Sequence, residues 1–414
     1  MAHLLAIVRR EAGFLRRQTT AYKLMVTRRM LHALANALSL QYNSLYATLL
    51  GASPVQLGSL QSVGNAVGAL ASLPAGHFID FYGLRKVLLL GTGFLLVSRV
   101  VYAAAPSWMW LYLAIVLYYL GMRLTCTACS VNCAAELQNQ DRATGRGFCH
   151  TVVSPLTIVS PILAAALITR LGGIRVESLR PIYGIETVIF AGIFLLLFFR
   201  LSGQLPANRQ PAYHGLRSEF AEVFRQGPDV VRLIWIMGLS ELPWVLTQTF
   251  VPVYAHEFKG ASQFVLGGIA IANTLVPMVF SLPLGRLADR LGRKKVLFAI
   301  APLTNLGNLC LLLAPASGLG SSLLLLLYGV LFGFNSINMV LVSSMAAEVM
   351  PKEHMGRWLG VIGLFRGLMG IPVPLMGGLI WEHLGPHFVF LTSIGIDVLL
   401  RLPILARTRE TLQG

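Results

Sequence analysis

A glycine-rich, charged stretch occurs twice in the chain, and the two copies are separated by about half of its length. In each copy a glycine is followed four residues later by an aspartate, three residues after that by a second glycine, and then by basic residues. Both copies lie between apolar runs, and glycine permits a sharp turn, so each predicts a tight loop that places a carboxylate beside arginine and lysine. The positions are Gly76, Asp80, Gly83 and Arg85 in the first copy, and Gly285, Asp289, Gly292, Arg293 and Lys294 in the second.

A second pattern repeats with almost the same period. The run from Gly121 to Arg146 resembles the run from Gly333 to Arg357, and each contains an Ala-Ala-Glu sequence followed by a Gly-Arg pair. Two patterns that share one period predict a duplicated membrane unit. The charged positions of these runs are Glu136, Arg146, Glu348 and Arg357.

The composition indicates which solvent surrounds the chain. Hydrophobic residues make up 55% of the 414 positions and charged residues only 12%, which is more apolar surface than one soluble core can bury. The lipid bilayer is therefore the expected solvent. The formal net charge of +16 would favour nucleic acid in a soluble protein, but the positions of the basic residues indicate a different role, and no nucleic-acid partner is expected.

Apolar spans long enough to cross a bilayer predict an all-α membrane protein with twelve transmembrane helices. The spans are 28–50, 56–79, 87–105, 108–135, 147–170, 181–200, 229–256, 262–284, 295–315, 321–348, 357–382 and 387–406. They predict a basic N-terminal segment at 1–27, six-helix bundles at 28–200 and 229–406, a linker at 201–228 and a tail at 407–414.

The basic residues are distributed unequally between the two sides of this predicted membrane protein. Of the 33 lysines and arginines, four fall on one side (Arg170, Arg175, Arg180 and Lys259), four lie inside spans (Arg99, Arg123, Arg366 and Arg401), and the rest share the side of the termini. Positive loops stay in the cytoplasm, so both termini are expected there, in a multi-pass protein of the inner (plasma) membrane. The Arg-rich segment 1–27 is expected to lie on the membrane surface, with a mitochondrial transit peptide as the alternative.

The repeated glycine–aspartate loops, the two sets of six spans and the Gly-Arg loops resemble the major facilitator superfamily. The resemblance implies two pseudo-symmetric bundles that alternate access to a central site, with helices 1, 4, 7 and 10 lining it. It also implies that Asp80 and Asp289 act as latches, each accepting hydrogen bonds from a neighbouring helix N-terminus and pairing with a base. Alternatively, the loop charges only orient the chain. The first copy departs from the family by having Leu84 at its first basic position.

An acidic residue inside a span is the main functional candidate, since an intramembrane charge is costly and tends to mark a pathway. Glu241 lies near the centre of the seventh span, and Trp244 and Gln248 follow on the same helical face. We expect Glu241 to exchange a proton. Alternatively, it forms a structural pair with Arg123 or Arg232. Arg123, near mid-depth in the fourth span, is expected to bias Glu241 or to bind a substrate carboxylate.

Polar stripes on two further helices predict substrate contacts, although hydrogen bonding between helices would explain them as well. They contain Asn36 and Asn43 in the first span and Asn335 and Asn338 in the tenth. Arg366 is expected to face the cavity or a neighbouring carboxylate. Asp397 and Arg401, four residues apart, are expected to pair, whereas Arg99 has no evident local partner and Glu186 is expected near the outer, hydrated end of its span.

Three cysteines share one face of the fourth span, and a histidine begins the fifth. Cys126, Cys129, Cys133 and His150 would suit a soft metal ion, although cysteine is also a common packing residue. No nucleotide-binding loop or metallohydrolase motif occurs, so neither an enzyme nor a resident cofactor is expected.

The expected function is secondary active transport, in which protons drive the export of a small amphipathic organic solute or drug by a monomeric antiporter. Three alternatives remain open. The first is a proton-coupled importer of an organic anion that uses Arg123 and Arg366, and the second is a copper or zinc carrier that uses the thiols. The third is a membrane receptor or scaffold that does not transport.

Overall fold

The computed structural model describes residues 17–136, 142–201, 228–349, 355–408 and 410, and within them every regular element is a helix. The first group of helices comprises α2 (Thr20–Ser39), α3 (Asn43–Leu49), α4 (Pro54–Tyr82), α5 (Leu84–Ala104), α6 (Trp110–Glu136), α7 (Arg142–Arg170) and α8 (Val176–Arg200). The second comprises α10 (Pro228–Thr247), α11 (Val251–Val253), η2 (Tyr254–Phe258), α12 (Gln263–Leu291), α13 (Arg293–Leu313), α14 (Leu319–Val349), α15 (Met355–Gly370), α16 (Pro372–His383), α17 (Pro386–Gly395), η4 (Ile396–Arg401) and α18 (Leu402–Arg407).

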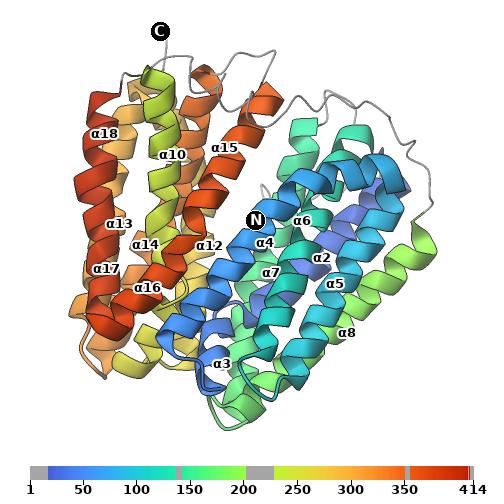
Figure 1. Ribbon diagram of the computed structural model, residues 1–414, viewed down its shortest axis with the longest axis horizontal. Coiled ribbons are helices and arrows are strands. Elements are labelled where there is room, and N and C mark those ends of the chain that lie inside the picture. Colours follow the sequence, from blue (N-terminus) through green and yellow to red (C-terminus); the bar gives the residue numbers. More distant parts are fainter. Residues whose placement is uncertain (1–16, 137–141, 202–227, 350–354, 409, 411–414) are drawn as a thin grey trace, which may run out of the picture.

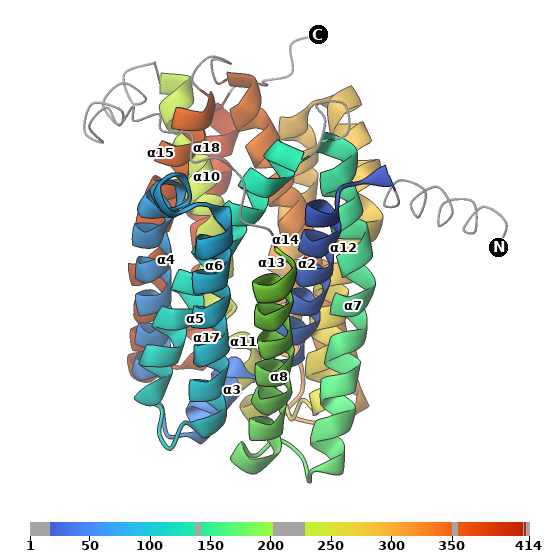
Figure 2. The same ribbon diagram turned by 90° about the vertical axis from the view of Figure 1, so that its right-hand side faces the viewer.

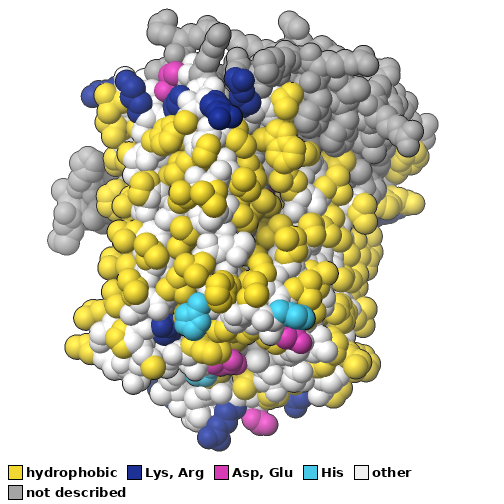
Figure 3. All heavy atoms as spheres, turned by 60° about the vertical axis from the view of Figure 1, so that its left-hand side comes forward, with side chains coloured by type: hydrophobic (Ala, Val, Ile, Leu, Met, Phe, Trp, Pro, Cys, Tyr) yellow, Lys and Arg dark blue, Asp and Glu magenta, His cyan; other side chains and the backbone are white. Residues whose placement is uncertain are grey.

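These helices have the length and surface of membrane spans. Among the described residues, nine candidate spans are long and apolar enough to cross a bilayer. Large apolar side chains such as Val188 and Leu313 are about three-quarters exposed, and Figure 3 shows a broad apolar belt with basic side chains gathered above it. The prediction of an all-α membrane fold is confirmed.

The first helix begins earlier than the sequence predicts. The expected span starts at residue 28, but α2 begins at Thr20, because the Thr19 hydroxyl accepts a hydrogen bond from the backbone N–H of Tyr22 (3.2 Å) and so caps the helix. Tyr22 and Met25 are buried. Part of the segment that was expected to lie on the membrane surface therefore belongs to the helical bundle.

The two groups lie side by side, α2–α8 on the right of Figure 1 and α10–α18 on the left. Across the boundary, α4 packs against α15 and α16, and α7 packs against α12. Figure 2 shows α7 and α12 next to each other. The helix order places the turns at Gly83 and Gly292 at one end of the bundle, which we call the basic end, and the turns at Gly51 and Gly260 at the other, which we call the opposite end.

The two groups touch most closely near the opposite end, where glycine lets backbones meet. A Cβ atom on Gly58 of α4 would lie 2.2 Å from the carbonyl oxygen of Pro374, and one on Gly378 would lie 2.5 Å from that of Pro54. Close approach of this kind requires small residues. The Ser62 hydroxyl also accepts a hydrogen bond from the backbone N–H of Leu375 (3.1 Å).

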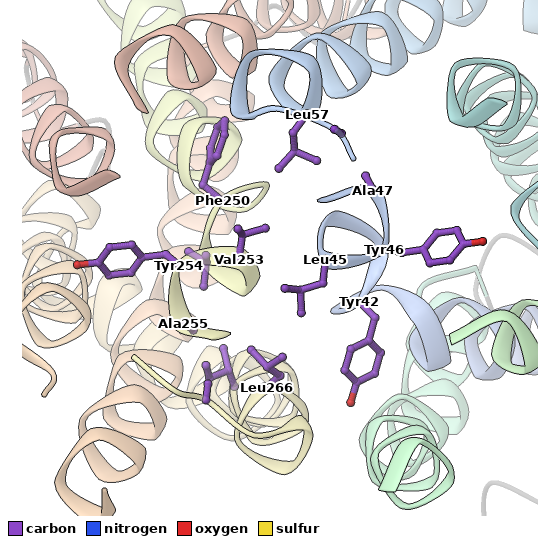
Figure 4. Packing of buried hydrophobic residues seen from close by; sticks show 14 of the residues in the cluster. Tyr42, Leu45, Tyr46, Ala47, Leu57, Phe250, Val253, Tyr254, Ala255 and Leu266 are labelled. Carbon is purple, nitrogen blue, oxygen red and sulfur yellow. The ribbon is translucent and has the colours of Figure 1, made fainter. Parts of the chain in front are cut away.

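An apolar plug closes the opposite end between the two groups. It consists of Leu45, Leu57, Phe250, Val253 and Leu266, all buried in one hydrophobic cluster. Figure 4 shows Leu45 of the first group facing Val253 of the second. Beside the plug, the Tyr42 hydroxyl donates a hydrogen bond to the carbonyl of Gln263 (3.1 Å), which joins α12 to the first group.

Toward the basic end the two groups separate. Along α4 the contacts with the second group run from Pro54 to Ala69, which packs against Gly367 of α15. Arg123 and Cys126, farther along α6 toward the basic end, are exposed. Among the described residues, the two groups are thus closed against each other at the opposite end and open toward the basic end.

Candidate functional site

A cavity of about 430 Å³ lies between the two groups, on the inner side of the apolar plug. Its walls come from both groups, and its charge is low: Arg99 is the one charged side chain in the described lining. Aromatic rings supply much of the surface, and Trp244 stacks on Phe332 (5.6 Å between centroids), which stacks on Tyr328 (5.2 Å). A flat apolar wall with scattered polar groups suits an amphipathic organic molecule.

Three of the predicted substrate-binding residues line this first cavity. Asn43, Trp244 and Gln248 are in its wall, and the Asn43 side-chain oxygen accepts a hydrogen bond from the Tyr183 hydroxyl (2.9 Å). Asn335 and Asn338 are buried in α14 outside the described lining of both cavities. Neither side-chain amide atom of Asn338 has a hydrogen-bond partner among the described residues.

A second cavity, of about 320 Å³, continues from the first toward the basic end. Leu40, Gln41, Ala270 and Thr274 line both cavities. The wall of the second is formed by one face of α2 together with α6, α7 and α12. Asn36, the remaining predicted contact of the first span, lies in this second wall rather than beside Asn43.

Arg99 and Glu186 form a buried ion pair that the sequence did not predict. The distance between Arg99 Nε and the Glu186 carboxylate is 2.9 Å, and both side chains are at most 1% exposed. The expectation of a hydrated Glu186 was therefore wrong, because α8 packs this residue against α5. One feature of the sequence could have predicted this pair: the first half of the chain contains two intramembrane charges of opposite sign, neither of which has a local partner.

Hydrogen bonds and aromatic rings complete the surroundings of Arg99. Its guanidinium donates to the Asn36 side-chain oxygen (3.0 Å), which also accepts from the Tyr118 hydroxyl (2.9 Å). The guanidinium carbon lies 4.9 Å from the centroid of the Tyr118 ring, within the range of cation–π attraction. Asn36 thus connects the ion pair in the first cavity to the wall of the second.

Glu241 is paired as well. Its carboxylate accepts from Arg366 Nε at 2.6 Å, and the pair is about a quarter to a third exposed. The partner is Arg366 rather than Arg123 or Arg232. Arg123 is exposed beside Gly68, and Arg232 donates to the backbone of Arg407. Because Glu241 precedes Trp244 by one helical turn, the pair lies just beyond the first cavity toward the basic end.

The local pair in the last span is confirmed. Asp397 and Arg401 form an ion pair within η4, and both are buried. Asn305 of α13 donates a further hydrogen bond to the Asp397 carboxylate (2.7 Å). These side chains hold α13 against the last span and lie outside the described lining of both cavities.

Two of the cysteines line the wall of the second cavity, and the described cysteines do not form a cluster. Cys126 and Cys129 lie in the wall of the second cavity, and Cys149 is close to the Tyr22 hydroxyl (3.7 Å). The side chains of Cys133 and His150 lie outside the described residues. Among the side chains that the structure describes, no three His, Cys, Asp or Glu residues come close enough together to hold a metal ion.

The second glycine–aspartate loop is held by the C-terminal tail. Asp289 is 3.6 Å from Arg293 and is mostly exposed, whereas the Glu410 carboxylate accepts from the backbone N–H groups of Arg293 (3.0 Å) and Lys294 (3.2 Å). The acid at the N-terminus of α13 is thus Glu410 and not Asp289. Gly292 has φ 101°, and a Cβ there would lie 2.5 Å from Glu410 Oε2.

The first loop is described only in part. Gly83 has φ 79° and makes the turn between α4 and α5, and Arg85 donates to the carbonyl of Phe198 (2.7 Å). Gly285 lies within α12. The remaining positions of the two repeated patterns belong to helices, but their surroundings lie outside what the structure describes; these are Gly76, Asp80, Glu136, Arg146, Glu348 and Arg357.

Two helix groups that enclose a cavity closed at one end of a membrane bundle define a solute carrier as the class of protein. The chain belongs to the Major Facilitator Superfamily, whose family model matches residues 29–276 and 233–411. It is therefore a multi-pass membrane transporter and not an enzyme.

The chain is similar to several transport and resistance proteins at low sequence identity. The chain is 24% identical over 378 residues to the multidrug resistance protein MdtG of Dickeya zeae, covering 87% of this chain and 88% of that protein. It is 27% identical over 184 residues to the class B tetracycline resistance protein of Escherichia coli, covering 44% and 43%. Among solved structures, the nucleoside transporter NupG is similar in fold, with a TM-score of 0.76 at 15% identity over 94% of this chain and 99% of that one.

Proposed function

We propose that the protein exports a small amphipathic organic solute in exchange for protons. The observation that carries this proposal is the first cavity, an aromatic chamber of about 430 Å³ between the two helix groups with an acid–base pair one helical turn away. Similarity to proteins named for multidrug and tetracycline resistance supports export. One chain encloses the whole cavity, so we propose that a monomer is the transporting unit.

The proposed orientation follows the charge bias. Most lysines and arginines outside the spans belong to the basic end, so we propose that this end faces the cytoplasm and that the protein lies in the inner (plasma) membrane. The state described above then faces the cytoplasm and is ready to load solute. Closure of the basic end and separation of the apolar plug would release the solute on the other side.

Glu241 is the proposed proton carrier because its protonation would break a contact near the boundary between the helix groups. A neutral Glu241 loses the charge that holds Arg366. The next residue, Gly367, packs against Ala69 of α4, where a Cβ would be 3.0 Å from the alanine methyl group. Proton binding therefore changes the side chain adjacent to an inter-group contact, which links the charge state of Glu241 to the arrangement of the two groups.

Transport by purified protein in liposomes tests this proposal. With the lumen more acidic than the medium, wild-type protein should accumulate tetracycline above the level in empty liposomes, and dissipating the gradient should stop it. Glu241→Gln should reduce uptake to the empty-liposome level. Glu177→Gln, which alters an exposed acid at the opposite end, should leave uptake unchanged.

Each result has a definite meaning. Gradient-driven uptake by Glu241→Gln equal to wild type would remove Glu241 as the carrier. Uptake by wild type that ignores the gradient would contradict proton coupling. If wild-type protein takes up no more tetracycline than empty liposomes, the proposal fails for this solute.

A further inference from the structure

The second cavity has a basic end built from one face of α2. Arg28, Arg29 and His32 all line it, at positions i, i+1 and i+4 of the helix. No aspartate or glutamate occurs in the described lining of this cavity. The first cavity, in contrast, has its single charge, Arg99, paired with Glu186.

Among the residues that the structure describes, Arg28 is a buried cation without a partner. Its side chain is only 5% exposed, and its buried Nε has no hydrogen-bond partner. Within the part of the chain that the structure describes, neither Arg28 nor Arg29 makes an ion pair. Burying a charge is costly unless an opposite charge compensates it, and a surface arginine that points into water would not be 5% exposed. A buried guanidinium of this kind favours the binding of a negatively charged group.

Further hydrogen-bond donors line the same cavity. The side-chain oxygen of Asn36 already accepts from Arg99 and Tyr118, which leaves its amide N–H groups as donors. Gln41 contributes an amide group, of which one N–H already donates to the carbonyl of Leu38 (3.4 Å) and the other remains as a donor. Guanidinium groups surrounded by neutral donors are the usual protein surroundings of carboxylate and phosphate groups.

We propose that the second cavity is a binding site for an anionic group, a carboxylate or a phosphate, held by Arg28 and Arg29. Its volume of about 320 Å³ accommodates a small anion or the charged end of a larger molecule. The group has two possible sources, a soluble anion from the basic end or the headgroup of an anionic lipid. The proposal concerns binding alone and does not rest on proton coupling, on the direction of transport or on Glu241.

Binding is measured by the thermal unfolding midpoint of purified protein in phosphatidylcholine nanodiscs, with sodium phosphate or sodium benzoate titrated against sodium chloride at constant ionic strength. In wild-type protein at least one of the two anions should raise the midpoint. In Arg28→Gln the half-maximal concentration should increase at least tenfold. Arg200→Gln, the same substitution at an exposed site on α8, should behave as wild type.

The unfolding midpoints of the two proteins without added anion provide a second test of the site. Arg28→Gln removes an unpaired buried charge, so its midpoint without added anion should equal or exceed that of wild type, whereas a merely structural arginine would lower the midpoint when replaced. Should Arg28→Gln not fold, Arg29→Gln takes its place.

The wild-type protein also contains a natural reporter of binding, because Cys126 lines the same cavity and is exposed. The anion should slow its alkylation by a maleimide about threefold or more.

Nanodiscs that contain phosphatidylglycerol distinguish the two sources. A soluble anion is the ligand if phosphate or benzoate acts equally in both lipid compositions. A lipid headgroup is the ligand if phosphatidylglycerol raises the midpoint in an Arg28-dependent way and the soluble anions, which act in phosphatidylcholine, add nothing further in its presence. Either outcome supports the site. The proposal is overturned if phosphate, benzoate and phosphatidylglycerol all act equally on wild type and Arg28→Gln, or if none protects Cys126.

Discussion

Arg99 of α5 and Glu186 of α8 form an ion pair 2.9 Å long that is almost entirely shielded from solvent. The same guanidinium donates to Asn36 of α2, so one side chain joins three helices of the first group. Arg99 also forms part of the wall of the first cavity. The pair thus joins helices of the first group and places one charged side chain, Arg99, in the wall of the first cavity.

Breaking this pair on one side should be strongly destabilising. Glu186→Gln leaves Arg99 in a dry interior with no counter-charge, and removal of one partner of a buried pair costs about 3–5 kcal/mol. We expect a large drop in the thermal unfolding midpoint of the detergent-solubilised protein. The double variant Arg99→Gln/Glu186→Gln, which contains no buried charge, should regain more than half of the loss. Equal losses in the single and double variants would assign the effect to packing.

A methyl group on Gly58 should open the opposite end. Its Cβ would lie 2.2 Å from a backbone carbonyl oxygen of α16, and a backbone cannot rotate away as a side chain can. Gly58→Ala should therefore favour separation of the two groups. With a thiol introduced by Leu45→Cys in the apolar plug, alkylation by an impermeant maleimide from that side should become several-fold faster. Gly184→Ala, whose Cβ meets nothing within 4 Å, should leave the rate unchanged.

The stacked rings of the first cavity predict a defect in solute binding. Trp244 stacks on Phe332 in the wall, and an aromatic contact contributes about 0.5–1.5 kcal/mol. Trp244→Ala should raise the KM for an aromatic solute about two- to tenfold, with a smaller change in kcat. Trp110→Ala, which removes a half-exposed ring outside the described cavity walls, is the matched control. A fall in kcat at unchanged KM would contradict a role in binding.

The C-terminal tail should loosen when its carboxylate is neutralised. Glu410 accepts hydrogen bonds from the first two backbone N–H groups of α13, and a negative charge at a helix N-terminus is worth about 0.3–1 kcal/mol. Glu410→Gln should speed tryptic cleavage after Arg407 about two- to fivefold. High salt should bring the wild type toward the variant. The control variant Glu382→Gln, at the opposite end, should be cleaved like wild type. Equal cleavage rates in wild type, Glu410→Gln and Glu382→Gln would contradict a role of Glu410 in holding the tail.

The elements that sequence predicts best depend on local patterns. The all-α membrane fold follows from hydropathy alone, and the Asp397–Arg401 pair follows from a spacing of one helical turn. The Arg99–Glu186 pair was missed because its members lie on different helices, and only the packing of α5 against α8 brings them together. The partner of Glu241 lies 125 residues away in the chain, which no helical period indicates.

The polar stripe of the first span shows a different limit. Asn36 and Asn43 are seven residues apart, and a continuous helix would place them on one face. In the structure α2 ends at Ser39 and α3 begins at Asn43. The break separates the two residues, so Asn36 lines the second cavity and Asn43 the first. Trp244 and Gln248, by contrast, share the first cavity as their spacing predicts.

The apolar plug makes the equilibrium between the closed and separated forms of the opposite end depend on temperature. Separating Leu45 from Val253 transfers apolar surface from protein to water, which increases the heat capacity. Hydrophobic closure weakens on cooling, so the fraction of molecules sealed at the opposite end should fall in the cold. Transport rates should therefore follow a curved Arrhenius plot even where the lipids undergo no phase transition, and the curvature should lessen as the plug residues are made smaller.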